Sequence, residues 1–249
     1  MGKLFNLDSP FMRLLTKMAD LMIVNFLTML CCIPVVTIGA AMSAAHYVLL
    51  KMKRDEEGYI TRDYFRAFKE NFKQATIIWL IALLVIAVLI GDFLIITYNT
   101  VVEIPFLVQA VVLVIGILTI FTLTWVFAVQ AKFVNTVKNT IKNSLMLSIL
   151  NLFRTIVMII VSLIPLVIFV FSVQLMPIAF LFGFSGPVYI SVMLYNKPFK
   201  KLEDRILEAQ EENGEETGED NAEETDERIF HDELQVPETF SASEVENKR

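Results

Sequence analysis

Long runs of apolar residues without any charge divide the first 200 residues of the chain. These runs cover residues 21–50, 75–91, 104–131 and 155–196. A run of about 18 such residues is typical of a helix that crosses the roughly 30 Å hydrocarbon core of a bilayer, because each helical residue rises about 1.5 Å. The pattern therefore predicts an all-α fold, a polytopic membrane helical bundle.

Proline and glycine set the predicted ends of the first two helices. As one helix, residues 21–50 would be about 45 Å long, too long for one span without heavy tilt. Pro34 and Gly39 supply a helix stop and a flexible residue within this run. We therefore expect six spans; the alternative is five, with residues 21–50 crossing once. The expected spans are residues 14–33, 37–52, 75–97, 104–130 and 155–173, and a sixth that ends near residue 196.

Two basic segments between the spans have amphipathic patterns. In residues 51–73, Phe65, Phe68 and Phe72 recur on one helical face, and the nearby cations lie off that face. Residues 132–154 also interleave basic and apolar positions. Such a helix lies in the headgroup plane with its rings buried and its cations toward anionic lipid. We expect two interfacial elbow helices; the alternative is packing against the protein's own cytoplasmic face.

The distribution of Lys and Arg predicts the orientation, since these residues concentrate in cytoplasmic loops. Six spans with a cytoplasmic N-terminus place all 17 Lys and Arg of residues 1–202 on the cytoplasmic side. Five spans would leave Lys3, Arg13 and Lys17 outside. The prediction is a multi-pass protein of the cell membrane with both termini in the cytoplasm.

Charge divides the chain into two parts. Residues 1–202 hold 17 basic and 9 acidic residues, a net +8, whereas residues 203–249 hold 4 basic and 18 acidic residues, a net −14. Residues 208–226 are almost free of apolar side chains, so they cannot offset the entropy of ordering. We expect a membrane domain over residues 1–202 and a mostly disordered cytoplasmic tail over residues 203–249. Scattered apolar residues near Leu234 could instead form a short docking motif.

The sequence contains no recognisable catalytic, cofactor or metal motif. The nine glycines never form a phosphate-binding loop, and no serine sits in a nucleophile-elbow pattern. The two histidines and the adjacent Cys31 and Cys32 do not have metal-ligand spacing. We therefore expect no catalytic, cofactor or metal residue, no enzyme activity and no nucleic-acid partner.

A few polar or helix-breaking residues within the spans are candidates for function. Asp92 in the third span is costly in hydrocarbon, so it is a site hypothesis unless it reaches the outer headgroups. His46 is a candidate ligand or proton carrier, or a side chain that extends to the interface. Pro34, Thr37 and Gly39 mark either a broken helix that exposes backbone groups to a ligand or a plain tight turn.

Other intramembrane polar residues favour structural roles. We expect Asn25, Thr28 and Gln109 to make hydrogen bonds between helices. Asp20 lies three residues after Lys17, so we expect these two to pair across one helical turn.

The chain resembles the YesL family of bacterial integral membrane proteins, found mostly in Firmicutes and without an assigned function. Residues 25–27 read Asn-Phe-Leu, residues 32–41 read Cys-Ile-Pro-Val-Val-Thr-Ile-Gly-Ala-Ala, and residues 64–73 read Tyr-Phe-Arg-Ala-Phe-Lys-Glu-Asn-Phe-Lys. The resemblance covers about residues 1–202 and is most specific in residues 34–40. The acidic tail departs from the family's usual short C-terminus. By the genomic setting of the family, the resemblance implies an association with carbohydrate ABC transporters.

Three functions follow as hypotheses. The first is a non-enzymatic accessory component of carbohydrate uptake, whose partners are the lipid bilayer and carbohydrate ABC transporter components. The second is a small transporter or channel acting on its own, for which Asp92 and the break at Pro34 are the motive. The third is a membrane scaffold that recruits a cytoplasmic partner through its acidic tail.

Overall fold

The computed structural model describes residues 10–56, 58–98, 105–171, 173–216 and 234–235. These residues form eight α-helices, and the predicted all-α class is confirmed. The helices are α1 (Pro10–Cys31), α2 (Ile38–Lys53), α3 (Ile60–Tyr98), α4 (Phe106–Lys132), α5 (Val137–Leu150), α6 (Leu152–Phe171), α7 (Met176–Phe182) and α8 (Ser185–Glu216). Two 3-10 turns, η1 (Val35–Thr37) and η2 (Val173–Leu175), precede α2 and α7, and two short strands are β1 (Phe133–Val134) and β2 (Leu234–Gln235).

The predicted division of residues 21–50 into two helices is confirmed, and the alternative of one helix through this run is wrong, because α1 ends at Cys31 and α2 begins at Ile38. Within the described residues, α1, α2 (with η1), α3, α4 and α6 are each long and apolar enough to cross a bilayer. A sixth candidate consists of α7 and the start of α8, two helices bent by 54° at a short break. The fold is that of a multi-pass membrane protein.

The first predicted elbow is not a separate helix. Helix α3 runs without interruption from the elbow residues into the third span, because the sequence has no proline or glycine between Ile60 and Gly91. Phe65 and Phe72 are exposed on the surface of the protein, but Phe68 packs against the core. The second elbow is confirmed as a separate helix, α5.

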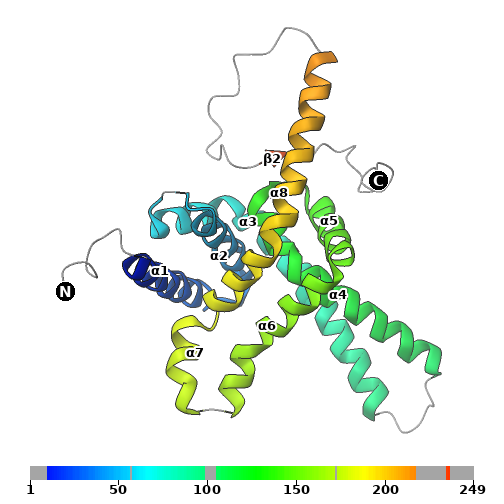
Figure 1. The fold of residues 1–249 in the computed structure, drawn as a ribbon. Helices are drawn as coiled ribbons and strands as arrows, with labels where there is room; N and C mark the ends of the chain where they lie inside the picture. The colour runs from blue at the N-terminus through cyan, green and yellow to red at the C-terminus, as the bar shows by residue number, and fades with distance from the viewer. Residues whose placement is uncertain (1–9, 57, 99–104, 172, 217–233, 236–249) are drawn as a thin grey trace.

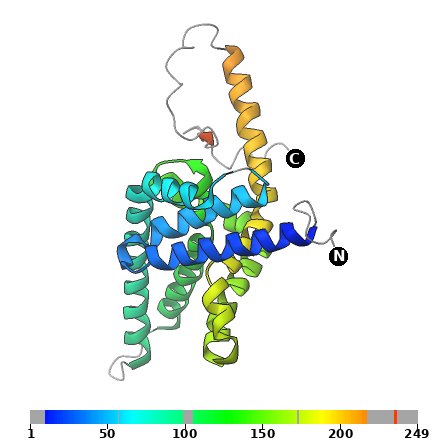
Figure 2. The ribbon, with the colours of Figure 1, turned by 90° about the vertical axis from the view of Figure 1, so that its left-hand side faces the viewer.

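Two helical hairpins project from one side of the molecule. Figure 1 shows the C-terminal part of α3 with α4 as one hairpin and α6 with α7 as the other, while α8 extends in the opposite direction. Figure 2 shows α1 and α2 running crosswise to these hairpins. The candidate spans therefore do not form a bundle of parallel helices.

Helix α2 lies at the centre of the packed body. Its residues from Gly39 to Leu50 are buried with the exception of Met42, and it contacts α1, α3, α4 and α8. Small residues at Ala40, Ala41 and Ala44 let neighbouring helices approach closely, which is how membrane helices gain packing energy. The core around α2 also takes in large aromatic side chains, chiefly Trp125, Tyr195 and Phe199.

Helix α8 continues past the boundary predicted at residue 202. It ends at Glu216, and Ile206 is fully buried against the body. Residues 208–216, predicted as disordered, are helical, and most of them are Glu, Ala or Gln, which are good helix formers. The rest of the predicted disordered segment lies outside the described residues. In the tail, β2 pairs in parallel with β1.

Candidate functional site

His46 lies inside the core rather than at the interface. It is 6% exposed, and its Nδ1 lies 3.0 Å from the hydroxyl of Tyr195 on α8. The ring of Tyr195 packs on Trp125 and Phe199, with ring centroids 6.1 and 4.6 Å away. The histidine is therefore part of an aromatic cluster that joins α2, α4 and α8.

Other buried polar groups also pair with each other across helices. Trp125 donates from Nε1 to the hydroxyl of Thr155 at 2.9 Å, which ties α4 to α6. Gln130 donates to the side-chain oxygen of Asn71 at 3.1 Å, which ties α4 to α3. A polar group buried in an apolar setting is costly unless it has such a partner, so these bonds fix how the helices pack.

Asn25 makes hydrogen bonds to backbone groups at the break between α7 and α8. Its Oδ1 accepts hydrogen bonds from the N–H groups of Phe184 and Ser185, at 2.8 and 3.1 Å. Its Nδ2 donates to the carbonyl of Phe180 at 2.8 Å. A helix break leaves unpaired backbone groups that hydrocarbon cannot satisfy. The prediction that Asn25 bonds between helices is confirmed, and its role is to stabilise this bend.

The segment from Pro34 to Gly39 forms a packed turn. The Thr37 hydroxyl hydrogen-bonds to the carbonyls of Cys31 and Pro34, at 2.5 and 2.7 Å. Trp79 of α3 donates from Nε1 to the carbonyl of Val35 at 2.8 Å. Protein groups therefore occupy three of the backbone carbonyls that a broken helix could offer to a ligand.

Gly39 explains why this turn fits against α3. A Cβ on Gly39 would lie 2.5 Å from the carbonyl oxygen of Ala75 and 2.7 Å from the Cβ of Trp79. Real side chains do not approach backbone this closely, so the position requires glycine. These contacts favour the turn interpretation, and a ligand role for Pro34, Thr37 and Gly39 stays a prediction.

Asp92 lies apart from the other candidates. It is half-buried on the projecting part of α3, six residues before the end of that helix at Tyr98. Among the described residues it makes no side-chain hydrogen bond or ion pair. His46 and the Pro34 turn belong to the packed body, so the structure does not bring the predicted candidates into one site.

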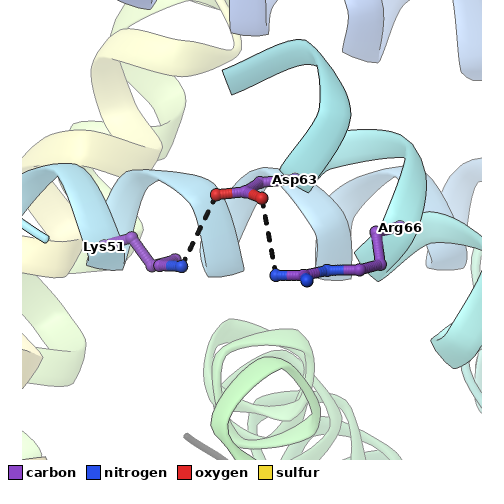
Figure 3. Close-up of polar contacts among 3 residues, drawn as sticks. All are labelled: Lys51, Asp63 and Arg66. Atoms are coloured by element: carbon purple, nitrogen blue, oxygen red, sulfur yellow. Dashed lines mark hydrogen bonds and ion pairs between the residues drawn. The ribbon is translucent and has the colours of Figure 1, made fainter. Parts of the chain in front are cut away.

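A cluster of ion pairs joins the end of α2 to α3 and α8. Its members are Lys51, Arg54, Asp63, Arg66 and Glu203. Figure 3 shows Asp63 between Lys51 and Arg66, at 3.5 and 3.4 Å. Arg54 binds both carboxylate oxygens of Glu203, at 2.6 and 3.0 Å. The bidentate geometry fixes the position of α8 against α2.

The predicted pair of Lys17 with Asp20 is wrong. Lys17 binds Asp55 instead, at 2.8 Å. Asp55 follows the end of α2 and has a left-handed φ of 55°, a conformation that Asp tolerates better than most residues. The hydrogen bond from Lys17 lowers the pKa of the Asp55 carboxyl below its ordinary value.

An apolar cavity of about 810 Å³ lies between the body and the second hairpin. Ser162 contributes a hydroxyl group to the wall, and this hydroxyl donates a hydrogen bond to the carbonyl of Met158 in the same helix. The volume is within the range of about 300–1,000 Å³ common for ligand pockets. The wall residues are Met29, Met42, Ser162, Pro165, Leu166, Phe169, Met176, Pro177, Ala179, Phe180, Gly183, Phe184, Pro187 and Val188.

This cavity was not predicted from the sequence. Its wall combines α1, α2, α6, α7 and α8, which no local pattern joins. The one available signal was the set of prolines within the last two spans, since Pro165, Pro177 and Pro187 all line it. Among the described residues, no group of three or more His, Cys, Asp or Glu is placed to hold a metal ion.

Comparison with known proteins gives a partial family match. The family described as "Protein of unknown function, DUF624" matches residues 21–93, which run from α1 through most of α3. This match is consistent with the resemblance to the YesL family. No curated protein and no solved structure matches the chain. The matched segment contains the packed turn, its glycine and the α3 residues that contact it.

Proposed function

We propose that the chain is a non-catalytic accessory subunit that binds a transmembrane helix of a partner protein at the apolar cavity, which takes up side chains of that helix. The observation that carries this proposal is a large cavity with an almost wholly apolar wall in a membrane protein. Two wall residues, Phe169 and Phe180, are 61% and 60% exposed, so the cavity opens at the surface of the second hairpin. An occupant can therefore enter sideways from the bilayer.

The residue types in the wall suit a helix as occupant. Membrane helices associate by close packing, and a small residue such as Ala179 allows close approach. Met29, Met42 and Met176 are flexible and polarizable, and methionine is common on surfaces that adapt to a partner's side chains.

The polar groups of the body support assembly rather than conduction of a polar substrate. His46, Trp125 and Asn25 all bond to groups of the protein itself. A sugar or ion would require polar partners along its path, and the cavity wall offers mainly carbon. The resemblance to the YesL family suggests the partner class, namely the membrane subunits of a carbohydrate importer.

Photo-crosslinking tests the proposal. A photoreactive residue replaces Phe169 in the cavity wall, and a matched variant carries it at Val114, an exposed position on α4 away from the cavity. In cells grown on inducing sugars, we expect the Phe169 variant to crosslink to a membrane subunit of a carbohydrate importer and the Val114 variant not to do so. Crosslinks to lipid alone at both positions would contradict the proposal.

Asp92 motivates the second candidate, a small transporter. Its half-buried carboxylate has no described side-chain partner on the projecting hairpin, which is a costly arrangement in hydrocarbon. Flux into proteoliposomes that contain the purified chain tests this candidate. Equal flux through wild type and Asp92→Asn would remove the carboxylate from any transport mechanism.

A further inference from the structure

The turn between α1 and α2 contacts α3 near the start of its apolar run. Trp79 donates a hydrogen bond to the Val35 carbonyl, and Gly39 lies against Ala75. The last basic residue before the run is Lys73. Trp79 is six residues beyond it, so the turn lies only about 9 Å along the helix from Lys73.

The far end of the same helix is much more distant. Tyr98 is 19 residues beyond Trp79, or about 29 Å along α3. A hairpin that crossed the bilayer beside α3 would place its turn near Tyr98. The observed turn instead lies at the end of α3 that adjoins the basic elbow.

The first half of α1 and the end of α2 also lie near the basic segment of residues 51–73. The end of α2 contacts the start of α3 through Lys51 and Asp63. The first half of α1 contacts the second residue after α2 through Lys17 and Asp55. The crosswise direction of α1 and α2 in Figure 2 agrees with these contacts.

We propose that α1 and α2 form a re-entrant hairpin that enters and leaves the membrane on the cytoplasmic side. Four segments then cross the bilayer: the C-terminal part of α3, α4, α6, and α7 with the start of α8. The hairpin leaves the N-terminus in the cytoplasm, and all 17 Lys and Arg of residues 1–202 stay there. The positive-inside rule therefore fits four crossings as well as six.

The chemistry of the turn fits a position at shallow membrane depth. Non-helical backbone within a membrane must be satisfied by protein, and Thr37 and Trp79 supply these bonds. Ile33, Val35 and Val36 are exposed apolar residues that acyl chains would cover. Trp79 is of the type that anchors helices at the membrane interface.

Cysteine labelling tests the proposal with three matched positions. In a Cys31→Ser, Cys32→Ser background, single cysteines replace Ile33 in the turn, Tyr98 at the far end of α3 and Tyr59 before α3. These residues are 74%, 76% and 80% exposed in the structure, so accessibility to reagent depends on membrane side and depth. A membrane-impermeant maleimide is applied to right-side-out and to inside-out vesicles, and labelling after solubilisation gives the total.

We expect Tyr98→Cys to react only in right-side-out vesicles and Tyr59→Cys only in inside-out vesicles. Ile33→Cys is expected to give less than a tenth of the Tyr98→Cys signal from outside, and Val36→Cys repeats the test at the other side of the turn. Reaction of Ile33→Cys from outside at the level of Tyr98→Cys would overturn the proposal. So would reaction of Tyr98→Cys from the inside.

Discussion

The packed body and the projecting hairpins have opposite distributions of buried residues. Almost every residue of α2 from Gly39 to Leu50 is buried, whereas the buried residues of α3 end at Ala82 and those of α4 begin at Trp125. Specific hydrogen bonds and ion pairs gather in the body. The body therefore determines the fold, and the hairpins present apolar surface to lipid or to a partner.

Because the body is close-packed and the hairpins are not, we expect the largest loss of stability from a substitution at Gly39. A methyl group in Gly39→Ala would collide with the backbone of Ala75, so we expect a loss of about 3 kcal/mol, at the upper end of the range for overpacking. Gly91→Ala on the hairpin is the control, because no atom lies within 4 Å of the added methyl. It should stabilise by up to about 1 kcal/mol through helix propensity. Thermal unfolding in detergent micelles measures both, and equal midpoints would contradict the account.

The ion pair of Arg54 with Glu203 is the next test of the body. Glu203→Ala leaves the Arg54 guanidinium mostly buried with Asn196 as its remaining described partner. We expect a loss of about 2–3 kcal/mol, somewhat less than for a fully buried pair. The double variant Arg54→Met, Glu203→Leu should recover most of this loss, because it buries no unpaired charge. A single variant with wild-type stability would show that α8 does not depend on this pair.

Substitution of Asn25 is expected to cause a smaller loss of stability. Its three hydrogen bonds at the α7–α8 break, at about 0.6 kcal/mol each in a membrane protein, predict a loss of about 2 kcal/mol for Asn25→Leu. Thr122→Val is the control, since the Thr122 hydroxyl donates to the Leu118 carbonyl within its own helix. Chemical unfolding in mixed micelles compares the two variants. A larger loss for Thr122→Val than for Asn25→Leu would remove Asn25 from its role at the break.

The exposed pair of Lys17 and Asp55 has the smallest expected effect. Because the folded protein lowers the pKa of Asp55 from its ordinary value of 3.8, the pair stabilises above that value and its contribution is lost as pH falls through the lowered pKa. Asp55→Asn should therefore reduce the stability slightly at pH 7, and this reduction should shrink as the pH falls below 3.8. Unfolding midpoints measured from pH 7 to pH 3 test this, and a difference that grows toward low pH would contradict it.

The sequence predicted the features that local physics decides. Uncharged runs identified the candidate spans, Pro34 identified the helix break, and Asn25 was recognised as an interhelical donor and acceptor. These predictions needed only the cost of polar groups in hydrocarbon and the stereochemistry of proline. The second elbow was predicted from the interleaving of its basic and apolar residues.

The features that were missed depend on contacts between distant residues. Lys17 was expected to bind a neighbour on its own helix, but its partner is 38 residues away. Arg54 and Glu203 are 149 residues apart, and nothing in the local pattern marks them as a pair. The apolar cavity and the crosswise direction of α1 and α2 arise in the same way, because they depend on how several helices pack.

The central claim is that the α1–α2 turn belongs to the body at one membrane face while the hairpins end at the other. A distance between spin labels at Ile33→Cys and Tyr98→Cys, in the background without native cysteines and in lipid nanodiscs, measures this directly. The account predicts a distance of about 30 Å, set by the length of α3 between Trp79 and Tyr98. A distance below about 15 Å, half that helix length, would place the turn beside the far ends of the hairpins and contradict the claim.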